Sequence, residues 1–168
     1  MTYERFEEVP VWQAAVDLAR RIFVMTRNRA FTGEGDLRSQ LQRAALSVSN
    51  NIAEGFERGT TQELITFLYY ARGSAGEVRS MLHVIDPLDG FTHLKSQISD
   101  LKSSAESISR QLRAWADYLQ NTPIKGQRYL NDAARQRHDD RARADAFLAS
   151  AREQLEEFRR ANEEQVND

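Results

Sequence analysis

The chain has 168 residues, a formal net charge of -2 and no cysteine. This length is enough to bury a core without a disulfide or metal cross-link, and the missing thiol excludes cysteine nucleophiles, disulfides and Cys-based zinc sites. The balanced charge argues against a global basic field for nucleic acid, and no stretch approaches the roughly 20 apolar residues of a membrane span, so we expect a soluble, cytoplasmic protein that does not contact a membrane.

The first amphipathic segment is predicted to form a helix from about Pro10 to Asn28. Pro10 suits the first helical turn, where its missing N–H would have no partner. Four arginines gather in the second half of this helix and just after it: Arg20, Arg21, Arg27 and Arg29. Cations near a helix C-terminus interact favourably with the helix dipole, which gives this cluster an electrostatic role. The cluster is also the best local candidate for a basic patch that contacts RNA.

A second helix is predicted between an Asp36 N-cap and a stop at Gly59, and it carries two stripes side by side. At 100° per residue, one stripe is apolar and contains Leu37, Leu41, Ala44, Ala45, Val48, Ile52, Gly55 and Phe56. The neighbouring stripe is polar and contains Arg43, Ser47, Asn50, Asn51, Glu54 and Arg58. Everything else in the chain can be interpreted as packing around this helix.

The polar stripe is predicted to be a buried structural network. Charges at this spacing usually form a solvated helix face, but Asn50 and Asn51 are mediocre helix formers, so helix propensity does not explain them. Buried amides need partners, which the flanking charged residues could supply. Glu54 could instead be a catalytic carboxylate, although a structural ion pair needs fewer assumptions.

The third helix is predicted to follow at once, because Thr60 and Glu63 form a capping box in which the Glu63 side chain reaches back to the Thr60 amide. The second and third helices therefore form an antiparallel hairpin. Gly73 and Gly76 lie inside the third helix, where each costs about 1 kcal/mol relative to alanine. By analogy with membrane helices, we assign them to the closest helix crossing, against the second helix.

A fourth helix follows, with a heptad seam at Leu94, Ile98, Leu101, Ala105, Ile108, Leu112, Trp115 and Leu119. Four amphipathic helices with short connections predict an all-α, up-down-up-down four-helix bundle over residues 1–122. Residues 123–168 are predicted to be a C-terminal helical extension, with a helix over 131–165. A largely disordered tail is the alternative for this segment.

Motifs for metal binding, phosphate binding and nucleophilic catalysis are missing from the sequence. A di-iron bundle needs Glu-x-x-His on two helices, and this chain contains none. His83, His93 and His138 lie on separate segments, which favours surface roles for all three. We therefore expect a protein that is not an enzyme and that needs no cofactor or metal.

Three sequence stretches resemble a known family. They are Trp12-Gln-Ala, the uninterrupted stretch from Leu37 to Gly55 followed by Arg58, and Phe67 to Ser74 followed by Glu77. Together they resemble the four-helix-bundle family of 23S rRNA intervening-sequence proteins, which is related to the accessory variability proteins of diversity-generating retroelements. The likeness covers roughly residues 6–120.

The resemblance implies a four-helix protomer that assembles into a ring-like homopentamer, and it brings no established catalytic residue. Leu46, Ser49 and Ala53 lie opposite the polar stripe and are predicted to meet a neighbouring subunit. Two functions follow as hypotheses. One is a non-catalytic oligomeric scaffold that binds an unidentified protein partner. The other is an RNA-binding or reverse-transcriptase accessory protein, although retroelement relatives are strongly basic and this chain is slightly acidic.

Overall fold

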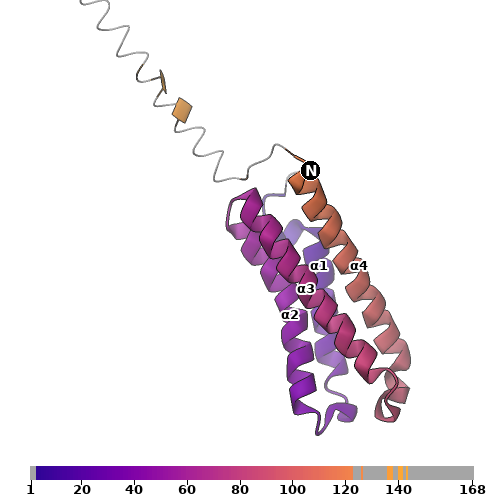
Figure 1. Cartoon of the computed structure of the whole chain (residues 1–168). Helices are drawn as coiled ribbons and strands as arrows, with labels where there is room; N and C mark the ends of the chain where they lie inside the picture. The colour runs from indigo at the N-terminus through magenta and orange to yellow at the C-terminus, as the bar shows by residue number, and fades with distance from the viewer. Residues whose placement is uncertain (1–2, 123–125, 127–135, 138–139, 142, 144–168) are drawn as a thin grey trace, which may run out of the picture. The chain divides into compact units, whose positions relative to one another are not determined.

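The computed structural model describes residues 3–122, together with 126, 136–137, 140–141 and 143. In this part of the chain the long elements are all helices: α1 Pro10–Met25, α2 Gly35–Glu57, α3 Thr61–Ile85 and α4 Lys95–Gln120. Short 3-10 helices accompany them: η1 Phe6–Glu8, η2 Arg29–Phe31 and η3 Asp89–Leu94. Each long helix packs against its two neighbours in ring order, α1 on α2, α2 on α3, α3 on α4 and α4 on α1 (Figure 1). The predicted all-α four-helix bundle is confirmed.

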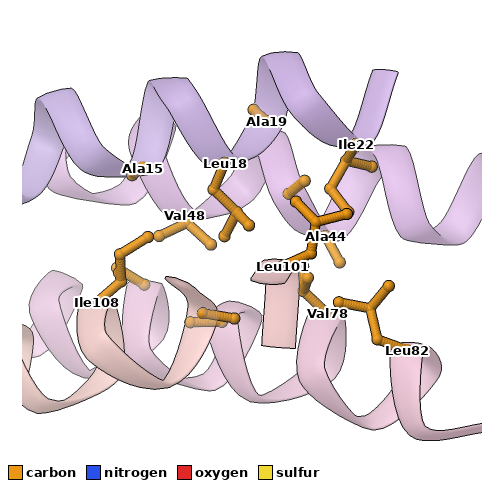
Figure 2. Packing of buried hydrophobic residues seen from close by; sticks show 14 of the residues in the cluster. Ala15, Leu18, Ala19, Ile22, Ala44, Val48, Val78, Leu82, Leu101 and Ile108 are labelled. Carbon is orange, nitrogen blue, oxygen red and sulfur yellow. The ribbon is translucent and has the colours of Figure 1, made fainter. Parts of the chain in front are cut away.

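The core consists mainly of aliphatic side chains contributed by all four long helices, with Phe31 of η2 and Phe91 of η3. The largest fully buried ones include Leu18 and Ile22 of α1, Leu41 and Ile52 of α2, Leu68 and Leu82 of α3, and Leu101 and Ile108 of α4. Figure 2 shows side chains of α1 and α2 pointing across the interior toward those of α3 and α4. Burial of one stripe per helix supplies the main stabilisation, at about 25 cal/mol per Å² of apolar surface removed from water.

Two predicted helix ends are wrong by a few residues, for local reasons. Helix α1 ends at Met25 instead of Asn28, because Asn28 is the N-cap of η2 and its side chain accepts a hydrogen bond from the Ala30 amide at 2.9 Å. Helix α2 begins at Gly35, so Asp36 lies in its first turn and is not the N-cap. A carboxylate in that turn still interacts favourably with the helix dipole.

The tight junction between α2 and α3 is confirmed, with one change in its hydrogen bonds. Gly59 adopts a φ of 78°, the left-handed conformation that ends many helices. The Thr60 hydroxyl accepts from the Glu63 amide at 3.2 Å, as the capping box predicts. The Glu63 carboxylate, however, accepts from the Thr60 hydroxyl at 2.6 Å, whereas the prediction paired it with the Thr60 amide.

The assignment of the closest helix crossing to Gly73 and Gly76 is wrong within the chain. A Cβ added at either position would meet no atom within 4 Å. The glycine that permits close approach is Gly55 of α2, where an added Cβ would lie 2.6 Å from Phe67 Cβ and 3.4 Å from Leu64 Cα. The pair of helices was predicted correctly, but the glycine is on the other member of the pair.

Most of the predicted seam of α4 is buried, with one exchange near its end. Ile98, Leu101 and Ala105 have no exposed surface. Trp115 is only half-buried, and its neighbour Ala116 is buried instead. The predicted extension after residue 122, including the helix over 131–165, lies outside the described residues except for scattered positions.

Candidate functional site

The inner part of the predicted polar stripe connects α2 to α3. The Asn51 amide donates to the Ser47 carbonyl at 2.8 Å and to the Ser47 hydroxyl at 3.0 Å. Ser74 Oγ of α3 lies 3.0 Å from Ser47 Oγ and 3.2 Å from the Tyr70 carbonyl oxygen. Because Ser74 has a single hydroxyl proton, it donates to only one of these oxygens at a time. Asn51 is half-buried and hydrogen-bonded, so the prediction for this residue holds in part.

The outer part of the stripe is a surface cluster at the end of α2. Arg58 Nη2 lies 2.6 Å from Glu54 Oε1, and Arg58 Nη1 lies 3.8 Å from Glu63 Oε1. The Arg58 guanidinium carbon also lies 5.0 Å from the centroid of the Phe67 ring, within the range of a cation–π interaction. The hydrogen bond to Glu54 raises the pKa of Arg58 above its ordinary value. The Glu54 side chain is 52% exposed, so its predicted burial is wrong.

The remaining stripe residues, Arg43 and Asn50, are exposed. Arg43 lines an open groove between α2 and α3, of about 500 Å³, with Glu77 of α3. The six stripe residues therefore do not form one network. They separate into a half-buried seam between helices, a surface ion-pair cluster and two solvated side chains.

The arginine cluster around the end of α1 is also divided. Arg21 faces α4, where its Nη1 donates to the Ser104 hydroxyl at 3.1 Å and lies 3.6 Å from Asp17 Oδ2. Arg29 is exposed on η2. Arg20 and Arg27 are exposed on a different side of α1 and line one groove. Of the four arginines, these two line a common groove.

That groove, named here the α1/α2 groove, is a mostly apolar depression of about 410 Å³. Its lining residues are Val16, Ala19, Arg20, Phe23, Val24, Arg27, Leu46 and Ser49. Val24 and Leu46 are 60% and 41% exposed, and both are large apolar side chains in contact with water. The groove thus combines a concave apolar surface with two cations.

The apolar spacing of α1 does not reveal the groove, because Val16 and Phe23 fit the same helical steps as the core residues of this helix. Both are only half-buried. The signal was present in the spacing: residues 16, 20, 23, 24 and 27 recur at helical steps and form a second stripe beside the core stripe. That stripe contains Arg20 and Arg27, which the sequence analysis assigned to the helix dipole and to a candidate basic patch.

The residues predicted to meet a neighbouring subunit differ in their exposure. Leu46 is accessible at the groove, whereas Ser49 is only 6% exposed and its hydroxyl donates to the Leu46 carbonyl at 3.1 Å. Ala53 is half-buried. A neighbouring protein could therefore contact Leu46 directly, with Ser49 accessible only at the base of the groove.

The possible metal ligands in the described part are dispersed. No group of three or more His, Asp or Glu side chains among the described residues is arranged to hold a metal ion. His93 Nε2 lies 3.1 Å from Asn28 Oδ1, which joins the α1–α2 connection to the α3–α4 connection. Among the same residues, no helix has the length and apolarity that are needed to cross a membrane.

Comparison with known proteins gives one family and a solved relative. The sequence profile of a family described as 23S rRNA-intervening sequence protein matches residues 7–114. A crystal structure of a protein of unknown function from the S23 ribosomal protein family of Bacteroides thetaiotaomicron is similar, with a TM-score of 0.56 and 19% identity. The match covers 63% of this chain and 97% of that one, and it supports the fold alone. No curated protein matches the sequence.

Proposed function

Because the chain belongs to the 23S rRNA-intervening sequence protein family and presents an open apolar groove on its helical bundle, we propose that it is a non-catalytic, self-associating scaffold that binds a protein partner. The observation that carries this proposal is the exposure of Val24 and Leu46, 60% and 41%, around the α1/α2 groove. Exposed apolar residues scattered singly are normal, but a concave cluster of them is typical of an interaction site.

The bundle core is complete without the groove. Leu18 and Ile22 of α1 have no exposed surface, while Val24 on the same helix is mostly exposed. The folded chain therefore does not use Val24 for its own packing. Covering the groove with another protein would remove this surface from water and stabilise the complex.

Self-association would also have apolar side chains available elsewhere in the described part. Tyr69, Tyr70, Val84, Leu88 and Tyr118 are between 40% and 60% exposed. The family resemblance implies a homopentamer, and the proposed location is the cytoplasm. Light scattering should give a mass several times the 19.3 kDa of one chain. A monomer at micromolar concentration would refute self-association.

Partner binding is tested by affinity purification of the full chain, with bound protein and bound nucleic acid both identified. We expect a protein that is retained by the wild type and lost by Val24→Glu, which places a charge at the groove. Val84→Glu is the matched control, since Val84 is also 60% exposed but lies on α3. Equal retention by both variants would show that the groove does not bind the partner.

A second candidate is an RNA-binding or reverse-transcriptase accessory protein, and the exposed pair Arg20 and Arg27 favours it. Each phosphate contact adds nearly one unit to the slope of log affinity against log salt, so two arginines support only weak, salt-sensitive binding. We expect no tight complex in a gel shift at physiological salt. Nanomolar affinity under those conditions would make the RNA hypothesis the first choice.

A further inference from the structure

The charges of the α1/α2 groove have one sign. Arg20 and Arg27 line it, seven residues apart on α1, and no carboxylate is part of the lining. Within the described part of the chain, neither arginine forms an ion pair, in contrast to Arg21 on the same helix. A ligand that complements the groove must therefore combine apolar groups with acidic ones.

The shape of the groove fits a helix. The side chains of α1 that line it recur at steps of three and four residues, so they form a ridge along about three turns of that helix. Leu46 of α2 lies across from this ridge, and the base contains the buried residues Ala19 and Ser49. Small side chains at the base and large ones at the sides accommodate the apolar face of another helix.

We propose that the α1/α2 groove binds an amphipathic α-helix of a partner protein that carries two acidic residues seven positions apart beside its apolar face. This inference rests on the proposed function, because that function assigns the groove to a protein partner. Seven helical residues span about 10.5 Å, so carboxylates at positions i and i+7 repeat the spacing of Arg20 and Arg27. Apolar anchors at intervening helical steps enter the groove, as in other helix-in-groove complexes.

The same charges argue against two other occupants. A second copy that docked groove against groove about a two-fold axis would bring its Arg20 and Arg27 against those of the first copy, and like charges at close range repel. A ring would instead place a different face of the neighbouring copy on the groove, and the light-scattering experiment below tests that occupant. A nucleic-acid strand would neutralise the arginines but would leave Val24 and Leu46 against a charged backbone. A helix that carries acidic residues beside an apolar face complements both the apolar side chains and the two arginines of the groove.

The test uses the full chain and two synthetic fluorescent peptides of about five helical turns. The peptides share one leucine face and differ only at two edge positions seven residues apart, which are glutamate in one and lysine in the other. Anisotropy should show the glutamate peptide binding about tenfold more tightly at low salt, with the difference shrinking as salt is added. The double variant Arg20→Glu/Arg27→Glu should reverse the preference, whereas Arg43→Glu, on the other groove, should leave it unchanged.

The site is located with single cysteines, because the chain has none of its own. An environment-sensitive dye on Val24→Cys should respond to the glutamate peptide, and the same dye on Val84→Cys should not. Equal affinity for both peptides, no saturable binding up to about 1 mM, or a response at Val84 only would overturn the inference.

Light scattering separates this inference from the proposed self-association. If Arg20→Glu/Arg27→Glu changes the mass of the assembly, a neighbouring copy fills the groove, and the inference fails while self-association survives. If the protein is a monomer that binds the glutamate peptide at the groove, self-association fails and the inference is upheld.

Discussion

Gly55→Ala tests the close contact between α2 and α3. The added Cβ would lie 2.6 Å from Phe67 Cβ, a distance that real Cβ atoms do not adopt. The opposing atom is the root of its side chain, so a rotamer change of Phe67 cannot relieve the clash and the helix backbones must separate. Overpacking of this kind costs about 1–3 kcal/mol, partly offset by a gain of about 1 kcal/mol in helix propensity.

Gly73→Ala is the matched control because the same methyl group would meet nothing within 4 Å. It should keep the propensity gain without the clash and stabilise the chain by about 0.5–1 kcal/mol. The difference in unfolding free energy between the two variants cancels the propensity gain and isolates the steric cost, about 1–3 kcal/mol.

Urea unfolding followed by circular dichroism would measure both variants against the wild type. We expect Gly55→Ala to lower the midpoint and Gly73→Ala to raise it, with unchanged slopes. A Gly55→Ala variant as stable as Gly73→Ala would refute the assignment of the contact. Destabilisation by Gly73→Ala would contradict the open space beside that glycine.

Three further predictions concern hydrogen bonds and pH. Asn51→Leu should destabilise the fold by about 1 kcal/mol in thermal unfolding, because Asn51 belongs to the hydrogen-bonded seam that reaches Ser74. Asn50→Leu, on the solvated face, should change the stability by no more than about 0.5 kcal/mol. Equal effects of the two variants would contradict the seam. Thr60→Ala removes the N-cap of α3 and should cost about 1 kcal/mol, and no change would show that the cap is dispensable. The 2.7 Å hydrogen bond from Lys102 lowers the pKa of Asp86 below its ordinary value of 3.8. The Asp86–Lys102 ion pair therefore stabilises the folded state above pH 3.8, and this stabilisation is lost as the pH falls through the lowered pKa. In an acid titration, the unfolding free energy of the wild type should exceed that of Lys102→Met near neutral pH, and the difference should disappear only in acid.

The helices were predictable because a core stripe needs only the local sequence. Steps of three and four residues fix which side chains share a face, and the core needs one such face per helix. Helix ends were less predictable, since they depend on which side chain captures a backbone amide. The Asn28 side chain captures the Ala30 amide, and this bond marks the start of η2.

The glycines show where sequence reasoning stops. A glycine inside a helix lowers the stability of that helix, but the reason for its presence depends on which atoms of the neighbouring helix face it. Gly55 has the Phe67 Cβ opposite and Gly73 has open space, and nothing in the sequence near either residue distinguishes them. Which residues face each other across two packed helices depends on how the helices pack together, and the sequence of either helix alone does not give it.

The polar stripe was identified correctly as a set of residues on one side of α2, but its burial was predicted too uniformly. The polar stripe of α2 is about two side chains wide, and part of it lies outside the surface that α3 covers. Asn51 is on the inner side and reaches Ser47 beside Ser74, while Glu54 is one turn further along and its side chain is 52% exposed. Periodicity gives the direction of a side chain, whereas burial also depends on how far the neighbouring helix extends over it.

The α1/α2 groove follows from the same geometry on the other side of α2. Two helices that pack through small residues such as Ala19 and Ser49 leave a furrow above their contact, and the next residues outward become its sides. In a chain that needed only to fold, polar side chains would line that furrow at no cost to the core. Here Val24 and Leu46 line it instead, and Arg20 and Arg27 supply charge of one sign. This combination of exposed apolar side chains and arginines that form no ion pair within the described residues is what the proposed binding of a partner helix requires.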